Sequence, residues 1–198
     1  RLAAVPGVYV PALYEARFED GRFAGVRPVS AAVPATIERR VEERLDASSH
    51  PSRPLVPLTE VTHDRLSVEI MRGCTRGCRF CQAGMITRPV RSRPTDDVAR
   101  LVEEGIAGTG CDEVSLVSLS SSDYDNLPGL VERLNQTLFD RRVSVSLPSL
   151  RLDSFSLELA KGIGAVRRAG LTFAPEAGTQ RLRDVINKNE TEQNLLRT

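Results

Sequence analysis

The sequence predicts an α/β fold built around a parallel sheet, and two observations lead to this prediction. From about Arg65 onward, short apolar or β-branched runs alternate with longer segments whose apolar residues recur at helical spacing. Such alternation is typical of strands joined by crossover helices. The second observation is composition: 198 residues, of which 40% are hydrophobic and 27% charged, are enough to bury an ordinary core.

The first 60 residues have a different pattern. Leu13–Phe18 and Phe23–Val29 are rich in β-forming residues and flank the turn sequence Glu19–Gly21, so they predict a β-hairpin. A helix is predicted over Pro34–Leu45, because three apolar residues there recur at every fourth position. Ala47–Pro57 is rich in Ser and Pro and indicates an extended strap.

Four strand–helix units are predicted after that strap. The strands are expected at Leu66–Met71, Val114–Leu119, Val143–Leu147 and Gly170–Ala174. The helices are expected from Thr95 to about Gly108, over Leu127–Leu138, around Phe155–Lys161 and from Thr179 to about Asn187, with another starting near Thr191. We expect the four strands to be parallel and ordered as in the chain.

Three of the four cysteines follow the first predicted strand directly. Cys74, Cys78 and Cys81 have the spacing C-x3-C-x2-C, with Phe80 before the third. Thiolates this close in sequence bind zinc or an iron–sulfur cluster. Three ligands would leave one iron of a cubane cluster open to a small molecule. The loop also follows the carboxyl end of a strand, where sites of parallel α/β proteins lie. We expect the three sulfurs to converge on one small volume there.

These residues resemble the signature of the radical S-adenosylmethionine (SAM) superfamily. The resemblance implies a partial parallel (βα) barrel of the radical SAM type, here cut after about four βα units. It implies a [4Fe–4S] cluster held by Cys74, Cys78 and Cys81, with SAM chelating the fourth iron. It also implies cleavage of SAM to a 5′-deoxyadenosyl radical, with an electron from a reductant such as flavodoxin or ferredoxin. The alternative is a non-catalytic zinc- or Fe–S-binding module.

The resemblance makes the residues after strands two to four candidates for SAM contacts. Ser120 and Ser121 stand where many members have a Gly-Gly-Glu-like segment, although an ordinary polar turn would look the same. Arg151 could fork onto the SAM carboxylate, or be a surface arginine. Glu176 could accept both ribose hydroxyls, or stabilise a helix N-terminus. With Phe80 these form the predicted cofactor-binding set, and no catalytic residue is predicted.

A closer resemblance covers nearly the whole chain. Pro6–Pro11, Val61–Arg65, the cysteine stretch through Gly84, and Gly170–Thr179 resemble radical SAM proteins that carry an upstream cobalamin-binding-like domain. This implies that residues 1–60 are a connector from that domain and 61–198 the N-terminal part of the barrel. Cobalamin would bind through the upstream domain. The first residue, Arg, also leads us to expect a piece of a longer protein. The cysteine region is distantly similar to the tRNA methylthiotransferases.

Charge leaves the substrate open. Six arginines crowd around the cysteines. They could balance the negative charge of three thiolates and a cluster, or bind an anionic partner, nucleic acid included. A formal net charge of +1 argues against long-range attraction to a polyanion. An RNA base, a protein side chain and a small metabolite therefore all remain candidates. Without a disulfide framework, a secretory segment or an apolar run of membrane length, we expect a cytoplasmic protein with no membrane partner. The six arginines are Arg72, Arg76, Arg79, Arg88, Arg91 and Arg93.

Overall fold

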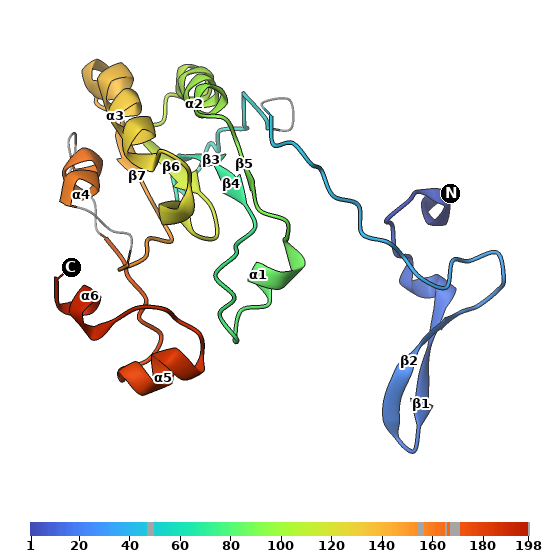
Figure 1. Cartoon of the computed structure of the whole chain (residues 1–198). Helices are drawn as coiled ribbons and strands as arrows, with labels where there is room; N and C mark the ends of the chain where they lie inside the picture. Colours follow the sequence, from blue (N-terminus) through green and yellow to red (C-terminus); the bar gives the residue numbers. More distant parts are fainter. Residues whose placement is uncertain (47–49, 154–156, 165, 167–170, 198) are drawn as a thin grey trace. The chain divides into compact units, whose positions relative to one another are not determined.

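The structure is a computed structural model that describes residues 1–46, 50–153, 157–164, 166 and 171–197. The chain divides into two compact units, Arg1–Glu43 and Arg44–Thr198. Figure 1 labels the helices and strands of both units.

The first unit contains the predicted hairpin. Strand β1 (Tyr14–Glu19) pairs antiparallel with β2 (Arg22–Pro28), and a turn at positive φ joins them. Two short 3-10 turns precede it, at Leu2–Ala4 and Pro11–Leu13. No residue of this unit is buried, so the hairpin has no core of its own.

The helix predicted over Pro34–Leu45 is wrong, because the backbone there is irregular. A helix of three turns is marginal unless a packed partner stabilises its apolar face. Here Ile37 and Val41 are only partly covered, and Leu45 is instead buried within the second unit, at 2% exposure. The three spaced apolar residues therefore do not share one buried stripe.

The second unit is built on a three-stranded parallel sheet whose order follows the chain, as predicted. Its strands are β3 (Leu66–Glu69), β6 (Glu113–Val117) and β7 (Ser144–Ser146). In register, Val68 lies opposite Leu116 and Val114 opposite Val145, and all four are buried in one core. This sheet sets the carboxyl ends at which a site is expected.

The predicted fourth strand is reduced to a single parallel bridge between Leu150 and Phe173. Its first residue, Gly170, lies outside the described residues. Pro148 ends β7 and has no N–H to donate, so no regular ladder leads from β7 to this bridge. The direction of the fourth segment is as expected, but within the described residues it forms no strand.

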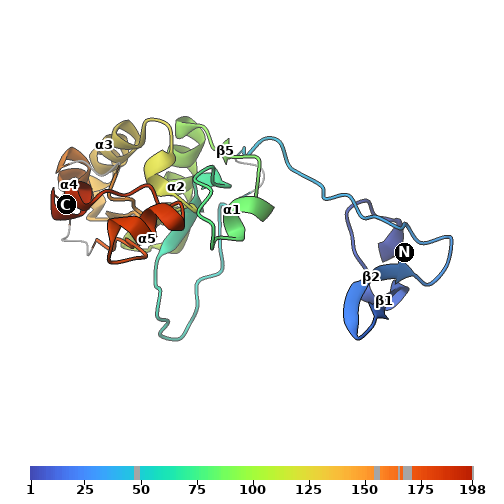
Figure 2. The same ribbon diagram turned by 60° about the horizontal axis from the view of Figure 1, so that its bottom comes forward.

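Three helices cover the sheet and pack side by side (Figures 1 and 2). They are α2 (Thr95–Thr109), α3 (Leu127–Leu138) and α4 (Leu157–Ile163). Helix α2 begins at Thr95 as predicted and ends one residue beyond Gly108. Two aspartates occupy its first turn, and Gly110 caps it in the left-handed conformation. Residues 155 and 156, where the third helix was expected to begin, lie outside the described residues.

Short elements complete the second unit. Helix α1 (Ala83–Ile86) follows the cysteines, and α5 (Gln180–Val185) and α6 (Glu192–Arg197) lie near the end of the chain. The 3-10 turns η4 (Ser121–Asp123) and η5 (Phe139–Arg141) follow β6 and α3. No helix in the described part of the chain is long and apolar enough to span a bilayer.

The predicted first strand divides in two at Ile70. Its N–H still donates to Val117 O, which continues the parallel ladder, whereas its carbonyl accepts from Arg93 N–H. Beyond this point β4 (Met71–Arg72) pairs antiparallel with β5 (Arg91–Ser92) instead of with β6. After Ile70 the chain thus leaves the parallel sheet, and its β4 segment pairs with the later β5 segment.

Candidate functional site

The cysteine loop, residues 73–90, is closed at its base by the β4–β5 ladder. Gly73 lies at this closure with φ +93°, in the region that favours glycine. A Cβ there would stand 2.9 Å from Thr87 O and 3.0 Å from Pro89 O. The two arms of the loop therefore touch at Gly73, and only a residue without a side chain fits between them.

The three cysteines of the loop are free and partly buried. Arg76 N–H donates to Cys74 Sγ at 3.5 Å, and Gly84 N–H donates to Cys81 Sγ at 3.4 Å. A Cβ on the buried Gly84 would lie 3.8 Å from Cys81 Sγ and 3.9 Å from Cys74 Cβ. The first and third cysteines thus lie beside the same buried glycine, and each sulfur accepts a backbone N–H.

The expected convergence of the three sulfurs is not confirmed. Among the described residues, no three His, Cys, Asp or Glu side chains are grouped so that they could hold a metal ion. The donor set nevertheless fits a three-thiolate centre in chemistry: three free thiols, one loop, and a cradle that a Cβ would fill. A cysteine has a single side-chain torsion, so its sulfur can be redirected without moving the backbone.

Arg76, between the first two cysteines, joins the loop to the ends of two strands. Its Nε donates to Asp123 Oδ2 at 2.7 Å and its Nη2 also pairs with that carboxylate. Its Nη1 donates to Asp153 Oδ2 at 3.1 Å. Asp123 follows β6 and Asp153 follows β7, so one guanidinium spans both connections. Burial alone would raise the pKa of Asp123, but hydrogen bonds from Arg76 and Ser120 outweigh it and hold that pKa below its ordinary value.

This pairing predicts a pH dependence of stability. An aspartate whose pKa is lowered in the folded state contributes stability above the ordinary pKa near 3.8, and that contribution is lost as pH falls through the lowered value. Asp123→Asn should therefore lower the free energy of unfolding by about 1.5–3 kcal/mol at pH 7. Its stability should also fall less steeply below pH 4 than that of the wild type, as measured by urea unfolding across pH.

Asp96→Asn is the matched control, because the pair between Asp96 and Arg133 lies on an exposed helix surface. We expect that change to have little effect on stability. Equal pH profiles for wild type and Asp123→Asn would contradict the assignment.

The predicted SAM contacts after β6 and β7 are buried and have partners within the chain. Ser121 Oγ donates to Pro148 O at 2.6 Å, and Ser120 Oγ donates to Asp123 Oδ2 at 2.7 Å. Arg151 is 6% exposed and donates to both oxygens of Asp153, at 3.1 and 3.2 Å. The two guanidinium N–H groups expected to bind a SAM carboxylate thus bind the carboxylate of Asp153. A SAM role for these three residues stays a prediction.

The other two predicted contacts are more accessible. Phe80 is 54% exposed. Glu176 is partly exposed, takes the left-handed conformation at φ +68°, and lies 3.7 Å from Lys188 Nζ. Lys188 in turn stands 3.8 Å from Glu190 Oε1. Sequence reasoning identified Glu176 by its place at a strand end, but did not identify its lysine partner.

Glu190 is a buried carboxylate that the sequence did not single out. It is 1% exposed, and its Oε1 lies 3.7 Å from Arg151 Nη2. Its Oε2 is buried without a hydrogen-bond partner among the described residues. Burial of a carboxylate is costly unless it is paired, and Arg151 and Lys188 offset the desolvation cost of Glu190.

All six arginines around the cysteines donate to groups of this chain. Arg72 pairs with Glu69, and the buried Arg93 donates to Glu69 O and Asp46 O. Arg79, Arg88 and Arg91 donate to backbone carbonyls at Val185, Gly84, Pro89 and Thr87. A loop with little regular structure leaves many carbonyls without backbone donors, and these guanidinium groups supply them.

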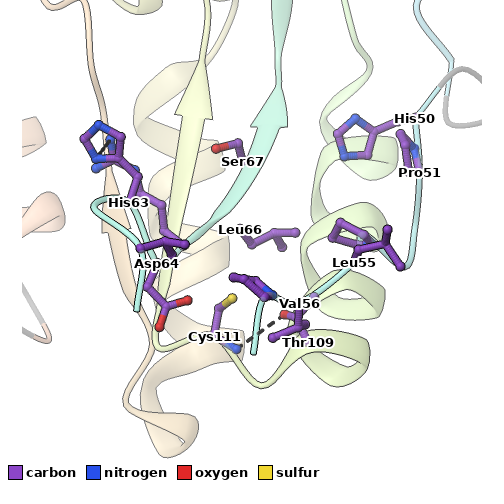
Figure 3. A pocket seen from close by; sticks show the side chains of 14 residues that line it. His50, Pro51, Leu55, Val56, His63, Asp64, Leu66, Ser67, Thr109 and Cys111 are labelled. Carbon is purple, nitrogen blue, oxygen red and sulfur yellow. Dashed lines mark hydrogen bonds between the residues drawn. The ribbon is translucent and has the colours of Figure 1, made fainter. Parts of the chain in front are cut away.

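A cavity of about 330 Å³ lies at the opposite, amino end of the sheet (Figure 3). The strap contributes His50, Leu55 and Val56 to its lining. Cys111, which lies just before β6, also lines it. It lies where Leu66 begins β3, away from the cysteine loop, which follows the carboxyl end. This cavity is therefore separate from the candidate site.

Fold and site together define an α/β protein with a cysteine-bearing loop at the carboxyl end of a parallel sheet. The family model described as "Radical SAM superfamily" matches residues 68–198. The chain belongs to this superfamily, as the cysteine spacing predicted. Membership implies a [4Fe–4S] cluster and SAM as cofactors.

Two curated relatives share part of the sequence. The chain is 38% identical over 128 residues to uncharacterized protein MJ0966 of Methanocaldococcus jannaschii, covering 65% of this chain and 27% of that protein. It is 36% identical over 75 residues to the ribosomal protein uS12 methylthiotransferase RimO of Thermotoga maritima, covering 34% and 17% respectively. The chain thus spans about a quarter or less of the length of these relatives.

A solved structure shares the fold. The apo form of the cobalamin-dependent S-adenosylmethionine radical enzyme OxsB superposes with a TM-score of 0.60 over 86% of this chain and 26% of that one. At 14% sequence identity the likeness concerns the fold alone. It supports the partial-barrel prediction.

Proposed function

We propose that the protein is a radical SAM enzyme in which Cys74, Cys78 and Cys81 hold a [4Fe–4S] cluster. The observation that carries this proposal is the loop itself: three free thiols on a glycine-shaped backbone beyond the carboxyl end of β3, in a chain of this superfamily. When bound, the cluster supplies one electron that cleaves the C5′–S bond of SAM into methionine and a 5′-deoxyadenosyl radical.

The chain's own residues would position these groups. The backbone N–H groups of Arg76 and Gly84 donate to two of the sulfurs and would orient them. The exposed ring of Phe80 offers an apolar face beside the third cysteine for part of SAM. Glu176, accessible at the end of the fourth segment, is proposed to accept the ribose hydroxyls. Its contact with Lys188 Nζ at 3.7 Å would orient that carboxylate.

The names of two similar proteins bear on the substrate. The relative RimO is by name a methylthiotransferase of a ribosomal protein, and OxsB is by name cobalamin-dependent. We accordingly propose a protein or small-metabolite substrate, with cobalamin as a second cofactor bound outside this stretch of chain. Residues 1–60 would connect to that part. A flavodoxin- or ferredoxin-type reductant in the cytoplasm would supply the electron.

Nucleic acid is the second candidate substrate, favoured by the exposed Arg79 and Arg88 of the cysteine loop. Both arginines already donate within the chain, so a nucleic acid would compete with these hydrogen bonds. A tRNA-binding series across salt concentrations separates the two: phosphate contacts would make affinity fall steeply with salt.

Anaerobic reconstitution followed by a SAM-cleavage assay tests the proposed function. We expect about four irons and four sulfides per chain, and 5′-deoxyadenosine after reduction with dithionite in the presence of SAM. The rival function is a non-catalytic metal-binding module. Stoichiometric zinc, with no 5′-deoxyadenosine after reduction, would establish that rival instead.

A further inference from the structure

The cysteine loop is held from one side by the segment that follows α5. Asn187 Nδ2 donates to Gly77 O at 2.8 Å and to Arg76 O at 3.2 Å. In return, Arg79 N–H donates to Ile186 O at 2.9 Å. These contacts join residues more than a hundred positions apart in sequence. Figures 1 and 2 both show α5 and the cysteine loop at the same end of the second unit.

From another side, the Arg76 side chain holds the same stretch of loop. It pairs with Asp123 after β6 and Asp153 after β7. The peptide between the first two cysteines is thus fixed through its carbonyl oxygens by Asn187 and through its guanidinium by two aspartates. The anchoring contacts go to carbonyl oxygens and to a guanidinium, so both anchors act on the loop between the cysteines.

The two anchors are connected through a continuous row of charges. We call it the charge chain: Arg76 contacts Asp153, Asp153 contacts Arg151, and Arg151 contacts Glu190. Glu190 and Glu176 then both contact Lys188, the residue next to Asn187. Most of these groups are largely buried, where such contacts are less screened by solvent than at the surface.

We propose that Asn187 is a positioning residue that sets the place of the cysteine loop relative to the Glu176–Glu190 segment. Through it and the charge chain, the cluster ligands and the carboxylate proposed for the ribose are held as one unit. The expected effect on SAM binding rests on the proposed function, because Asn187 would keep the cluster ligands in place relative to Glu176. The anchoring of the loop by Asn187 does not depend on any cofactor.

The residue type matches the task. Asn187 has φ +56°, a left-handed conformation that asparagine adopts more readily than most residues. Its amide supplies two N–H groups, which is what two adjacent carbonyls require. Aspartate would keep the shape but offer no donor, and glycine would keep the backbone but remove the side chain.

These properties give a discriminating pair of variants. Asn187→Gly preserves the left-handed backbone and removes both hydrogen bonds. Asn187→Asp keeps the size of the side chain and replaces its N–H donor group by an oxygen acceptor. Asn126→Gly is the matched control, because Asn126 also has a left-handed backbone, at φ +54°, and precedes α3 without a side-chain cap bond. Any general effect of an asparagine-to-glycine change appears in both positions.

The first measurement uses the intact protein without cluster. We expect the loop thiols of Asn187→Gly and Asn187→Asp to react severalfold faster with a thiol-specific reagent than those of wild type and Asn126→Gly, because the loop has lost one anchor. Cys111 provides an internal reference within each protein. Equal labelling rates in all four proteins would overturn the inference, whether or not the wild type cleaves SAM.

The second measurement uses reconstituted protein. We expect iron content within twofold of the wild type, because the three thiols are unchanged. The KM for SAM should rise about tenfold in both Asn187 variants, the scale of a lost hydrogen bond or two. The change that SAM causes in the EPR spectrum of the reduced cluster should also weaken. Wild-type KM and EPR response in equally loaded variants would overturn the inference.

Failure of the proposed function has a different signature. In that case the wild type itself forms no 5′-deoxyadenosine, while the thiol labelling still decides whether Asn187 anchors the loop. If Asn187→Gly folds poorly, Asn187→Asp keeps the comparison, since its side chain has nearly the same volume.

Discussion

Replacement of any one of Cys74, Cys78 or Cys81 by alanine is expected to lower 5′-deoxyadenosine formation by at least about a thousandfold, because two thiolates cannot hold a site-open cubane cluster. Iron and sulfide content should fall with it, and the absorbance of the reconstituted cluster near 400 nm should be lost. The measurement is product formation by chromatography beside metal analysis of the same sample.

Cys111→Ala is the internal control. Cys111 lies beside the cavity at the amino end of the sheet, outside the loop, and packs against the core. Its replacement should leave cluster content and product formation at wild-type levels. A single loop variant that keeps full cluster content would show that the ligand set is assigned incorrectly.

Gly73→Ala is expected to have the second largest effect. A methyl group there would lie 2.9 Å from Thr87 O, 3.0 Å from Pro89 O and 3.1 Å from Val90 Cα. These are backbone atoms and cannot turn aside as the end of a side chain can. The left-handed φ adds its own strain. We expect the free energy of unfolding to fall by about 3 kcal/mol and the cluster content to fall severalfold.

Gly110→Ala separates the two causes. Gly110 also has a positive φ, +74°, but a methyl group there would meet nothing within 4 Å. That variant should lose only about 1 kcal/mol and keep its cluster. If both variants lose the same amount, then the close contact of the two loop arms is not what requires glycine at position 73.

Much of the second unit could be predicted from local sequence patterns. Helices α2 and α3 carry their apolar residues at helical spacing and bury them, and the strands between them are short apolar runs. The failed helix over Pro34–Leu45 has the same spacing without the partner surface. Periodicity states which residues could share a face, whereas burial depends on what the rest of the chain places against it.

The candidate site was predictable where its residues are adjacent in sequence. Cys74, Cys78 and Cys81 form a local pattern, and the strand before them could be recognised. The partners of Arg76 lie 47 and 77 residues away, at the ends of two other strands. Such pairings follow from sheet order and loop path together, which no local pattern contains.

The density of arginines near the cysteines left two interpretations open, charge balance beside an anionic cluster and a surface for an anionic partner. In the structure these arginines donate to backbone carbonyls and carboxylates of the same region, which the sequence did not predict. The sequence did contain an indication of this role, because a long stretch without helix or strand needs side-chain donors for its backbone carbonyls.

The two-residue β4–β5 ladder has a consequence for how the protein acquires its cofactor. Joining the ends of a flexible segment of about 18 residues costs roughly 2.5 kcal/mol in chain entropy beyond a constant. Here that cost is met during folding, by Met71–Ser92 and Arg72–Arg91 pairing. Assembly of a cluster would then have to reorient three side chains rather than organise a coil. We therefore expect the cofactor-free protein to accept iron and sulfide quickly and with little change in its circular dichroism in the far ultraviolet.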